Sequence, residues 1–255
     1  MPIKMIATDL DGTLLRRDKS ISPYTKEVLQ QCRAAGVKVI YATGRGGSAN
    51  DKAPAALFDG RITMNGAVAY AGETLVHHRQ VPHEVARPLL LACHQRGLKT
   101  ASERGDMHYA NFDIVAEWPS LAGSTVSLVD FAQHSLDAEK LYMVTRSPED
   151  AAFIEQHLPE GLWLIVDRYG LAQVMHRDAA KSKAVGALAA HWGIQQHEIA
   201  AFGDDHNDVD MLRFAGTGVA MANAVDEAKA AADCLCATND EDGLARWLEK
   251  LLQSI

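Results

Sequence analysis

The sequence predicts an α/β protein in which a doubly wound parallel sheet carries an inserted α+β unit. Strand-like and helix-like segments alternate in the first and last thirds of the chain and are joined by short links, which is typical of a parallel sheet. The middle of the chain differs, because strand-like runs recur there with only two helical segments among them. We place the core in residues 1–80 and 181–255 and the insertion in residues 81–180.

The first third begins with a mostly apolar run over residues 3–10, which is typical of a buried parallel strand. Ser22-Pro23 predicts a helix start, since proline is favoured at the first helical position, and Gly36 ends that helix. Two further strands and a hairpin follow, over residues 37–42, residues 62–65 and the segment between Gly66 and Gly72.

The remaining elements are predicted by the same patterns. In the middle, helices cover residues 84–96 and begin at Ser147-Pro148, and the strand-like runs are residues 126–129, 141–144, 162–166 and 171–175. In the last third, a helix begins at Lys181, a strand ends at Phe202, a helix passes through Met211 and Leu212, and a strand covers residues 217–221.

Composition and charge exclude several classes of protein. Of the 255 residues, 47% are hydrophobic and 23% charged, as in ordinary globular proteins. A net charge of -8 without any run of Lys or Arg argues against nucleic-acid and anionic-membrane partners. No segment has the pattern of a signal peptide or a membrane helix, and the four cysteines form no Cys-x-x-Cys pair. We therefore expect a cytoplasmic protein, as a monomer or a small homo-oligomer.

Two carboxylates, Asp9 and Asp11, stand at the end of the first predicted strand, in the run Asp-Leu-Asp-Gly-Thr-Leu. Two acids this close to a buried strand repel each other and lose hydration unless a cation lies between them. The run therefore predicts a metal-dependent acid cluster.

Polar residues also follow two other predicted strands. Residues 43–45 read Thr-Gly-Arg, and residues 203–208 read Gly-Asp-Asp-His-Asn-Asp, while Lys181 begins the helix before the second of these strands. In parallel α/β sheets, ligands bind where the loops at the carboxyl ends of the strands converge. The three strand ends and Lys181 therefore predict one polar site.

These segments, in this order, resemble the motifs of the haloacid dehalogenase superfamily of phosphotransferases. Residues 218–224, 225–233 and 239–243 are in addition similar to the carboxyl end of the Cof-type sugar-phosphate phosphatases. The resemblance is dense over residues 1–70 and 170–250 and thin between them. It implies a Rossmann-like core, and it implies that residues 81–180 form a cap domain that sets substrate specificity.

The resemblance implies distinct roles for the two acids of the first motif. Asp9 is the expected nucleophile, which becomes a transient aspartyl phosphate. Asp11 is the expected general acid toward the leaving alkoxide and then the general base for water. An alcohol leaving group needs a proton, so the presence of Asp11 favours a phosphatase or a mutase over a receiver-type signalling domain.

The expected cofactor is Mg²⁺, because a carboxylate-rich site with only oxygen ligands suits this ion. Carried over by motif position, its ligands are a carboxylate oxygen of Asp9, the backbone carbonyl of Asp11 and the carboxylate of Asp204. Asp208 lies about one helical turn beyond Asp204, so it either binds through water or orients a ligand. Asp205 lies off that face.

Phosphate recognition is the second expected task of the site. Thr43 supplies a hydroxyl, the backbone N–H of Gly44 supplies a donor, and Lys181 is a point cation suited to phosphate and to Asp9. The full predicted set is Leu10, Thr43, Gly44, Arg45, Lys181 and Asn207, of which Asn207 matches the amide position of the family.

Two positions leave alternatives. In the family the lysine is usually followed by glycine, whereas here Ser182 and Lys183 follow, and the helical pattern favours Lys181 over Lys183. Arg45 serves either the substrate or a carboxylate of the site.

The predicted function is a Mg²⁺-dependent phosphatase that hydrolyses small phosphorylated metabolites, such as sugar phosphates, through an aspartyl phosphate. A phosphomutase of the same superfamily is the nearest alternative. A non-catalytic sensor of phosphometabolites is a third, and the intact acids and Lys181 argue against it.

Overall fold

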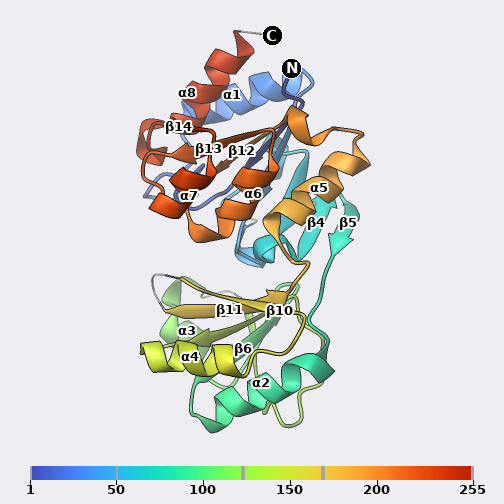
Figure 1. Cartoon of the computed structure of the whole chain (residues 1–255), viewed down its shortest axis with the longest axis vertical. Coiled ribbons are helices and arrows are strands. Elements are labelled where there is room, and N and C mark those ends of the chain that lie inside the picture. The colour runs from blue at the N-terminus through green and yellow to red at the C-terminus, as the bar shows by residue number, and fades with distance from the viewer. Residues whose placement is uncertain (1, 50, 122–123, 168–169, 254–255) are drawn as a thin grey trace. The chain divides into compact units, whose positions relative to one another are not determined.

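The structure of the protein is a computed structural model, which describes residues 2–49, 51–121, 124–167 and 170–253. It divides into two compact units (Figure 1). The core unit contains Met1–Arg45, Ala49–His78 and Ala180–Ile255, and the inserted unit contains Arg79–Ala179 together with Gly46–Ser48. The division thus falls within two residues of the limits expected from the sequence, and it assigns one short loop of the first third to the inserted unit.

The core unit is built on an eight-stranded sheet with the strand order β14-β13-β12-β1-β2-β3-β4-β5. Neighbouring strands pair in parallel from β14 to β3, and β4 and β5 add two antiparallel pairings at one edge. The strands are β1 (Met5–Thr8), β2 (Lys38–Ala42), β3 (Gly60–Thr63), β4 (Val68–Ala71), β5 (Thr74–His78), β12 (Ile199–Gly203), β13 (Thr217–Met221) and β14 (Cys234–Cys236).

Helices cover both faces of this sheet (Figure 1). α1 and α8 contribute buried residues to one apolar cluster, and α5, α6 and α7 contribute to the cluster on the other face. These helices are α1 (Pro23–Ala34), α5 (Lys181–His191), α6 (Val209–Phe214), α7 (Asp226–Ala231) and α8 (Gly243–Leu252). A parallel sheet needs this double cover, because its central strands are apolar on both sides. The α/β, doubly wound fold class is therefore confirmed.

The start of α1 shows how the local sequence positions the chain. Ser22 is the N-cap, and its side chain accepts a hydrogen bond from the backbone N–H of Thr25, while Pro23 occupies the first helical position. Gly36, just beyond the helix, has a φ of 85°, which favours glycine. These signals were readable in the sequence, and the predicted helix is confirmed.

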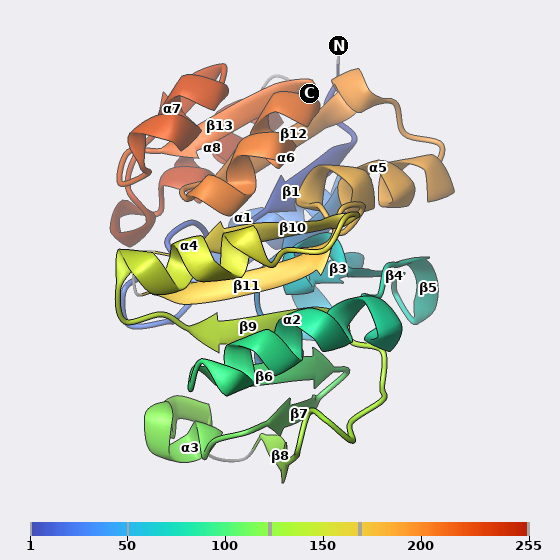
Figure 2. The ribbon, with the colours of Figure 1, turned by 60° about the horizontal axis from the view of Figure 1, so that its bottom comes forward.

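The inserted unit is a six-stranded sheet with the order β10-β11-β9-β6-β7-β8, antiparallel except for the β7–β8 pair. α2 and α4 cross one face of it (Figure 2). The elements are α2 (His83–Gln95), β6 (Lys99–Arg104), β7 (Met107–Ala110), α3 (Ile114–Glu117), β8 (Thr125–Leu128), β9 (Lys140–Val144), α4 (Pro148–Gln156), β10 (Leu162–Val166) and β11 (Leu171–His176).

The four predicted strands of the insertion are present, but β6 and β7 were missed. The sequence of β6, Lys-Thr-Ala-Ser-Glu-Arg, has no apolar alternation. It forms a strand because β9 and β7 pair with it on either side. Among the described residues, no helix is both long and apolar enough to cross a membrane.

Candidate active site

The parallel strands of the core bring the predicted segments to one edge of the sheet. β12, β1, β2 and β3 are consecutive neighbours, and Asp204, Asp9 and Thr43 each follow the end of one of them. The backbone N–H of Asp9 donates to the carbonyl of Phe202 at 2.9 Å, which extends the pairing to the first acid. Residues almost 200 positions apart in sequence are thereby adjacent because parallel strands end at the same edge.

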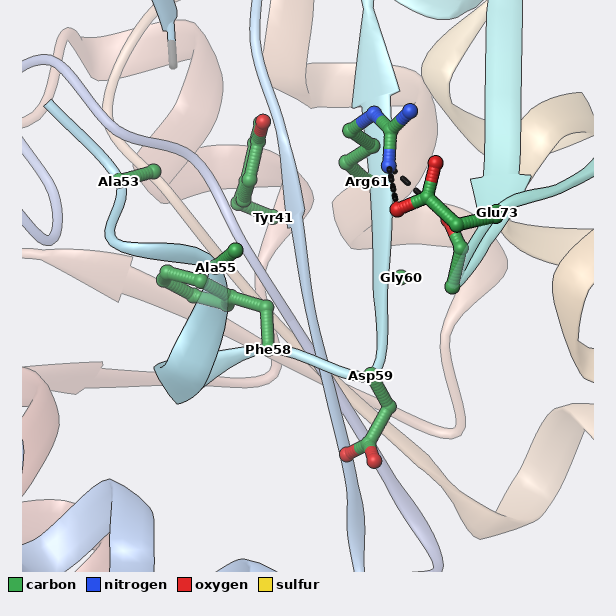
Figure 3. A pocket seen from close by; sticks show the side chains of 9 residues that line it. Tyr41, Ala53, Ala55, Phe58, Asp59, Gly60, Arg61 and Glu73 are labelled. Carbon is green, nitrogen blue, oxygen red and sulfur yellow. Dashed lines mark hydrogen bonds and ion pairs between the residues drawn. The ribbon is translucent and has the colours of Figure 1, made fainter. Parts of the chain in front are cut away.

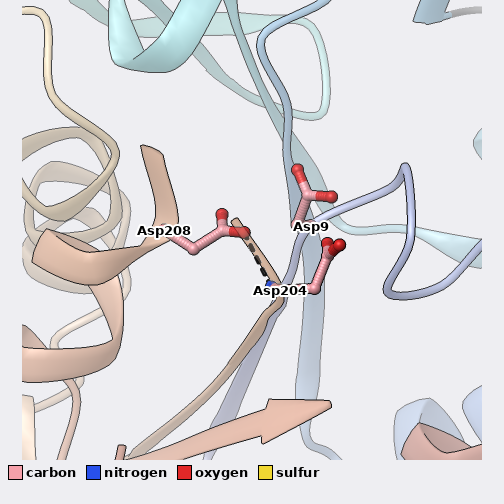
Figure 4. A group of neighbouring side chains, drawn as sticks. All are labelled: Asp9, Asp204 and Asp208. Atoms are coloured by element: carbon pink, nitrogen blue, oxygen red, sulfur yellow. Dashed lines mark hydrogen bonds between the residues drawn. The ribbon is translucent and has the colours of Figure 1, made fainter. Parts of the chain in front are cut away.

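Three carboxylates form a compact group at this edge (Figure 4). One oxygen from each of Asp9, Asp204 and Asp208 lies within 4.8 Å of the others. Their exposed fractions are only 5%, 5% and 0%, respectively. Carboxylates at this depth need compensating charge or hydrogen bonds.

Lys181 supplies part of that compensation. Its Nζ atom donates to Asp9 at 2.7 Å and to Asp208 at 2.6 Å, and its side chain is fully buried. Lys183, the alternative from the sequence, is exposed. The structure thus brings Lys181 and not Lys183 to the acids. Burial opposes its charge, but Asp208 and Asp9 outweigh this and raise the pKa of Lys181.

The cluster retains an excess of negative charge, since three carboxylates face one ammonium group. Burial raises the pKa of Asp9 well above its usual value; Lys181 opposes this shift, and Asp208 and Asp204 add to it. Burial and then Asp208 raise the pKa of Asp204 to about 7. An excess of two negative charges on oxygen donors is the environment in which a hard divalent cation is stabilised. The residues therefore fit Mg²⁺.

Asp208 also organises the neighbouring backbone. Its Oδ1 accepts the Lys181 hydrogen bond, while its Oδ2 accepts the backbone N–H groups of Asp204 at 2.9 Å and Asp205 at 3.1 Å. With both oxygens engaged, Asp208 is suited to orient Lys181 and Asp204. Gly203 makes this possible, because a Cβ there would lie 2.4 Å from that of Asp208.

Asp11 has a different environment from Asp9. Arg45 donates two hydrogen bonds to the Asp11 carboxylate, and Lys19 Nζ donates a third at 2.7 Å. Burial raises the pKa of Asp11, but the hydrogen bonds from Arg45 and Lys19 outweigh burial and lower it to about 2. The structure thus places Arg45 against a carboxylate. Lys19 was not expected from the sequence, and its φ of 66° is rare for a residue with a side chain.

Thr43 and Asn207 form hydrogen bonds with Asn65, and Gly44 approaches its side chain closely. The Asn207 side chain donates to Asn65 Oδ1 at 2.9 Å, and the backbone N–H of Asn65 donates to the Thr43 carbonyl at 2.9 Å. A Cβ at Gly44 would lie 2.8 Å from Asn65 Oδ1. The side chain of Thr43 accepts from the backbone N–H of Arg45 at 3.2 Å.

Asn65 was not among the predicted site residues, although a signal for it existed. It is 2% exposed with a φ of 52°, and Gly66 follows it at the end of β3. An Asn-Gly pair that ends a parallel strand is a turn signal at the very edge where the site lies. A Cβ at Gly66 would lie 2.3 Å from the backbone of Ala180, so glycine lets the residue before Lys181 approach.

Thr13 was also missed, although it lies within the first motif. Its hydroxyl donates to Asp204 Oδ1 at 2.9 Å, and it is 1% exposed. Next to it, Gly12 has a φ of 86°, and a Cβ there would lie 2.2 Å from Asp204 Oδ2. Gly12 thus leaves room for the Asp204 carboxylate, and Thr13 donates a hydrogen bond to it.

The remaining predicted positions are more peripheral. The Leu10 side chain is fully buried in the apolar core, so only its backbone groups are left for a ligand. Asp205 accepts a hydrogen bond from the backbone N–H of His206 at 2.8 Å, and His206 is exposed. Leu10, Asp205 and His206 therefore all lie outside the cluster of Asp9, Asp204 and Asp208.

Comparison with known proteins agrees with this geometry. Residues 6–248 match the family model of haloacid dehalogenase-like hydrolases. The chain belongs to that family. It is 30% identical over 265 residues to a putative phosphatase of Haemophilus influenzae, and the match covers 98% of both chains. The predicted family and the predicted enzyme class, phosphoric monoester hydrolase, are therefore confirmed.

Two further relatives extend the family comparison. A 5-amino-6-(5-phospho-D-ribitylamino)uracil phosphatase of Bacillus subtilis is 29% identical over 266 residues, with 96% of both chains covered. A solved structure of a subclass IIB sugar phosphatase superposes with a TM-score of 0.85 at 27% identity, and covers 97% of this chain and 98% of its own.

Proposed function

We propose that the protein is a Mg²⁺-dependent phosphatase that hydrolyses small phosphate monoesters, sugar phosphates foremost, through an aspartyl phosphate on Asp9. The observation that carries the proposal is the buried Asp9 carboxylate, held at 2.7 Å by Lys181 and flanked by two further acids at the edge of the parallel sheet. The names of two relatives, which specify a sugar phosphatase and a phosphatase of a phosphoribityl compound, support the substrate class.

The metal site we propose uses Asp9 and Asp204 as carboxylate ligands and the backbone carbonyl of Asp11. Asp208 contributes by orienting Asp204 and Lys181, in line with its engaged oxygens. When bound, Mg²⁺ supplies positive charge that offsets the carboxylates and the phosphate.

In the first step we propose, a carboxylate oxygen of Asp9 attacks the phosphorus atom, and the bond between phosphorus and the leaving oxygen breaks. Lys181 holds the attacking carboxylate in place, and with Thr43, Gly44, Arg45, Asn207 and the backbone of Leu10 it binds phosphate oxygens. Donors fixed in advance around the phosphate stabilise its charge in the transition state.

Asp11 serves both steps. It gives a proton to the leaving alkoxide, then takes one from the water that attacks the aspartyl phosphate, which releases inorganic phosphate and restores Asp9. With its pKa held at about 2 by Arg45 and Lys19, Asp11 is ionised in the free protein. The proposal therefore requires the substrate phosphate to draw Arg45 away from Asp11, after which Asp11 can hold a proton.

We further propose that residues 81–180 act as the specificity-setting cap, and that the protein works in the cytoplasm. The four cysteines are free thiols, which is consistent with a reducing compartment.

A panel of phosphorylated metabolites, scored for phosphate release with Mg²⁺ and with EDTA, tests the proposal. We expect release that EDTA abolishes and Mg²⁺ restores, and rapid acid quenching should trap phosphate on Asp9. Full turnover in EDTA contradicts the metal assignment. Formation of an isomeric phosphate ester in place of inorganic phosphate identifies a mutase, and the lack of any turnover across the panel supports a sensor.

A further inference from the structure

A cavity lies in the core unit, beside β2 and β3 (Figure 3). Its volume is about 340 Å³. Pockets that hold small ligands span roughly 300–1,000 Å³. None of the residues that line it has a role in the proposed reaction: Tyr41, Ala53, Ala55, Phe58, Asp59, Gly60, Arg61, Gly72 and Glu73. The cavity is therefore large enough for a small organic molecule and separate from the acid cluster.

Tyr41 forms the most informative wall. It is 3% exposed and lines the cavity, and within the described part of the chain no group forms a hydrogen bond with its hydroxyl. The hydroxyl is not among the buried polar atoms that lack a partner, so it is open to solvent and can donate a hydrogen bond to a ligand oxygen. The ring of Phe58 stands edge-on to Tyr41, with 5.0 Å between the ring centroids, so the same wall has an aromatic surface.

Arg61 lies beside Tyr41 in Figure 3, on the neighbouring strand β3. Its guanidinium stacks over the Tyr70 ring at 4.2 Å and donates to the carbonyl of Gly72 at 2.9 Å, so its position is held. Burial is the main influence that raises the pKa of Tyr41, and the Arg61 charge is near enough to oppose it. Tyr41 and Arg61 are register partners on the adjacent strands β2 and β3, so their side chains leave the same face of the sheet and can contact one ligand.

The two acids that line the cavity, Asp59 and Glu73, do not neutralise Arg61 strongly, so its charge can attract an anionic ligand. The pair between Arg61 and Glu73 is long, at 3.9 Å, and the Glu73 side chain is 96% exposed, so the pair is weak. The Asp59 carboxylate points away from Tyr41 in Figure 3 and accepts two hydrogen bonds from Arg33, both at 3.1 Å. An anion placed between Tyr41 and Arg61 therefore meets little repulsion.

We propose that this cavity binds a small organic carboxylate with a planar apolar body. The carboxylate accepts hydrogen bonds from Tyr41 and Arg61, whose planar guanidinium matches its geometry. The body lies against Phe58, Ala53 and Ala55, where ring stacking adds to apolar burial. The site does not depend on the proposed phosphatase reaction.

Titration with benzoate tests the proposal in the full chain without Mg²⁺. With alanine methyl groups labelled by carbon-13, the NMR signals of Ala53 and Ala55 should shift and saturate as benzoate is added. Benzylamine has the same ring and the opposite charge, and it should leave both signals in place.

Three variants assign the contacts. Tyr41→Phe removes one hydroxyl and should weaken benzoate about 5-fold, with an unchanged melting temperature because the hydroxyl has no described partner. Arg61→Gln should weaken it by about 10-fold or more. Glu73→Gln removes the competing acid and should tighten binding about twofold.

The opposite results overturn the proposal. They are an absence of saturable shifts at both methyl groups, equal shifts with benzylamine, or an unchanged benzoate affinity in Tyr41→Phe. Because Arg61→Gln can disturb the β3–β4 pairing, Glu73→Gln provides the second measurement, and weaker binding there is equally decisive. Phosphate release is measured separately, so failure here leaves the proposed function standing.

Discussion

The two units place their buried charges in different ways. In the core, Asp9, Asp204 and Lys181 gather at the edge where parallel strands end. In the inserted unit, Glu103 and Lys140 sit opposite each other on β6 and β9, joined at 2.8 Å within the antiparallel sheet. Parallel strands collect polar groups at their ends, whereas antiparallel strands pair them across a face.

The difference teaches where a ligand is needed. The pair in the inserted unit is neutral by itself, so it needs no ion or ligand to compensate its charge. The core cluster keeps excess negative charge, so it is stable only with protons or a cation. Changes in the core should therefore alter chemistry, and changes in the inserted pair should alter stability.

The largest expected effect is that of Asp9→Asn. Without the nucleophile no phosphoenzyme can form, and turnover should fall at least about 10⁴-fold on every substrate. The variant should remain folded, because the substitution removes one of the three carboxylates that repel each other in the acid cluster. Rapid-quench labelling and steady-state assays on aryl and sugar phosphates measure this. A labelled phosphoenzyme in the variant would assign the nucleophile to another residue.

Asp11→Asn should distinguish the role of Asp11 from that of Asp9. It removes the proton for a sugar alkoxide, and the loss of general acid catalysis costs about 10²–10⁴-fold. A nitrophenolate leaves without that proton, so the first step should partly recover on an aryl phosphate, and phosphoenzyme should accumulate. Equal losses on both substrates with no trapped intermediate would falsify the division of roles.

Lys181→Met and Lys183→Met form a matched pair on α5. Loss of the buried ammonium should lower kcat by about 10²–10³-fold, because Asp9 loses its anchor and the phosphate loses a cation. The exposed Lys183 should be replaceable with less than about a twofold change. A comparable loss of kcat in both variants would point to a general effect of charge at this helix.

In the inserted unit, Lys140→Met should act on stability. It leaves Glu103 buried and uncompensated, which costs about 3–5 kcal/mol of unfolding free energy. The paired variant Glu103→Leu with Lys140→Met should regain much of this. Urea denaturation measures both, and turnover of an aryl phosphate by the folded protein should change less than about twofold. A large loss of turnover in the double variant would place this pair in the chemistry.

The smallest effect concerns pH without metal. Asp204 has a usual pKa of 3.8 and a folded pKa of about 7, so the folded state holds a proton that the unfolded state releases. Its stabilising contribution is thus complete below pH 3.8 and is lost as the pH rises through 7. We expect the unfolding free energy in EDTA to fall by on the order of 2–4 kcal/mol across this window.

Added Mg²⁺ should remove most of that fall, since it compensates the ionised acids. Thermal unfolding at a series of pH values, with EDTA or Mg²⁺, measures both curves. An unfolding free energy in EDTA that rises from pH 5 to pH 8 would contradict the raised pKa of Asp204 on which this prediction rests.

Much of the core could be predicted because its signals are local. The apolar runs before Asp9 and Thr43, the capped helix at Ser22 and the helix start at Lys181 each follow from neighbouring residues. The convergence of the strand ends then follows from the parallel topology alone. The strands β6 and β7 lacked such signals, because pairing with neighbouring strands determines them.

By itself, the sequence determined the α/β class, the family and the residues that end the core strands, since period, caps and motifs are properties of short segments. Only the tertiary structure decided that Lys181 spans Asp9 and Asp208, that Arg45 and Lys19 grip Asp11, and that Asn65 joins Asn207. Those contacts join residues from separate elements. Their energies depend on burial and distance, which no local pattern encodes.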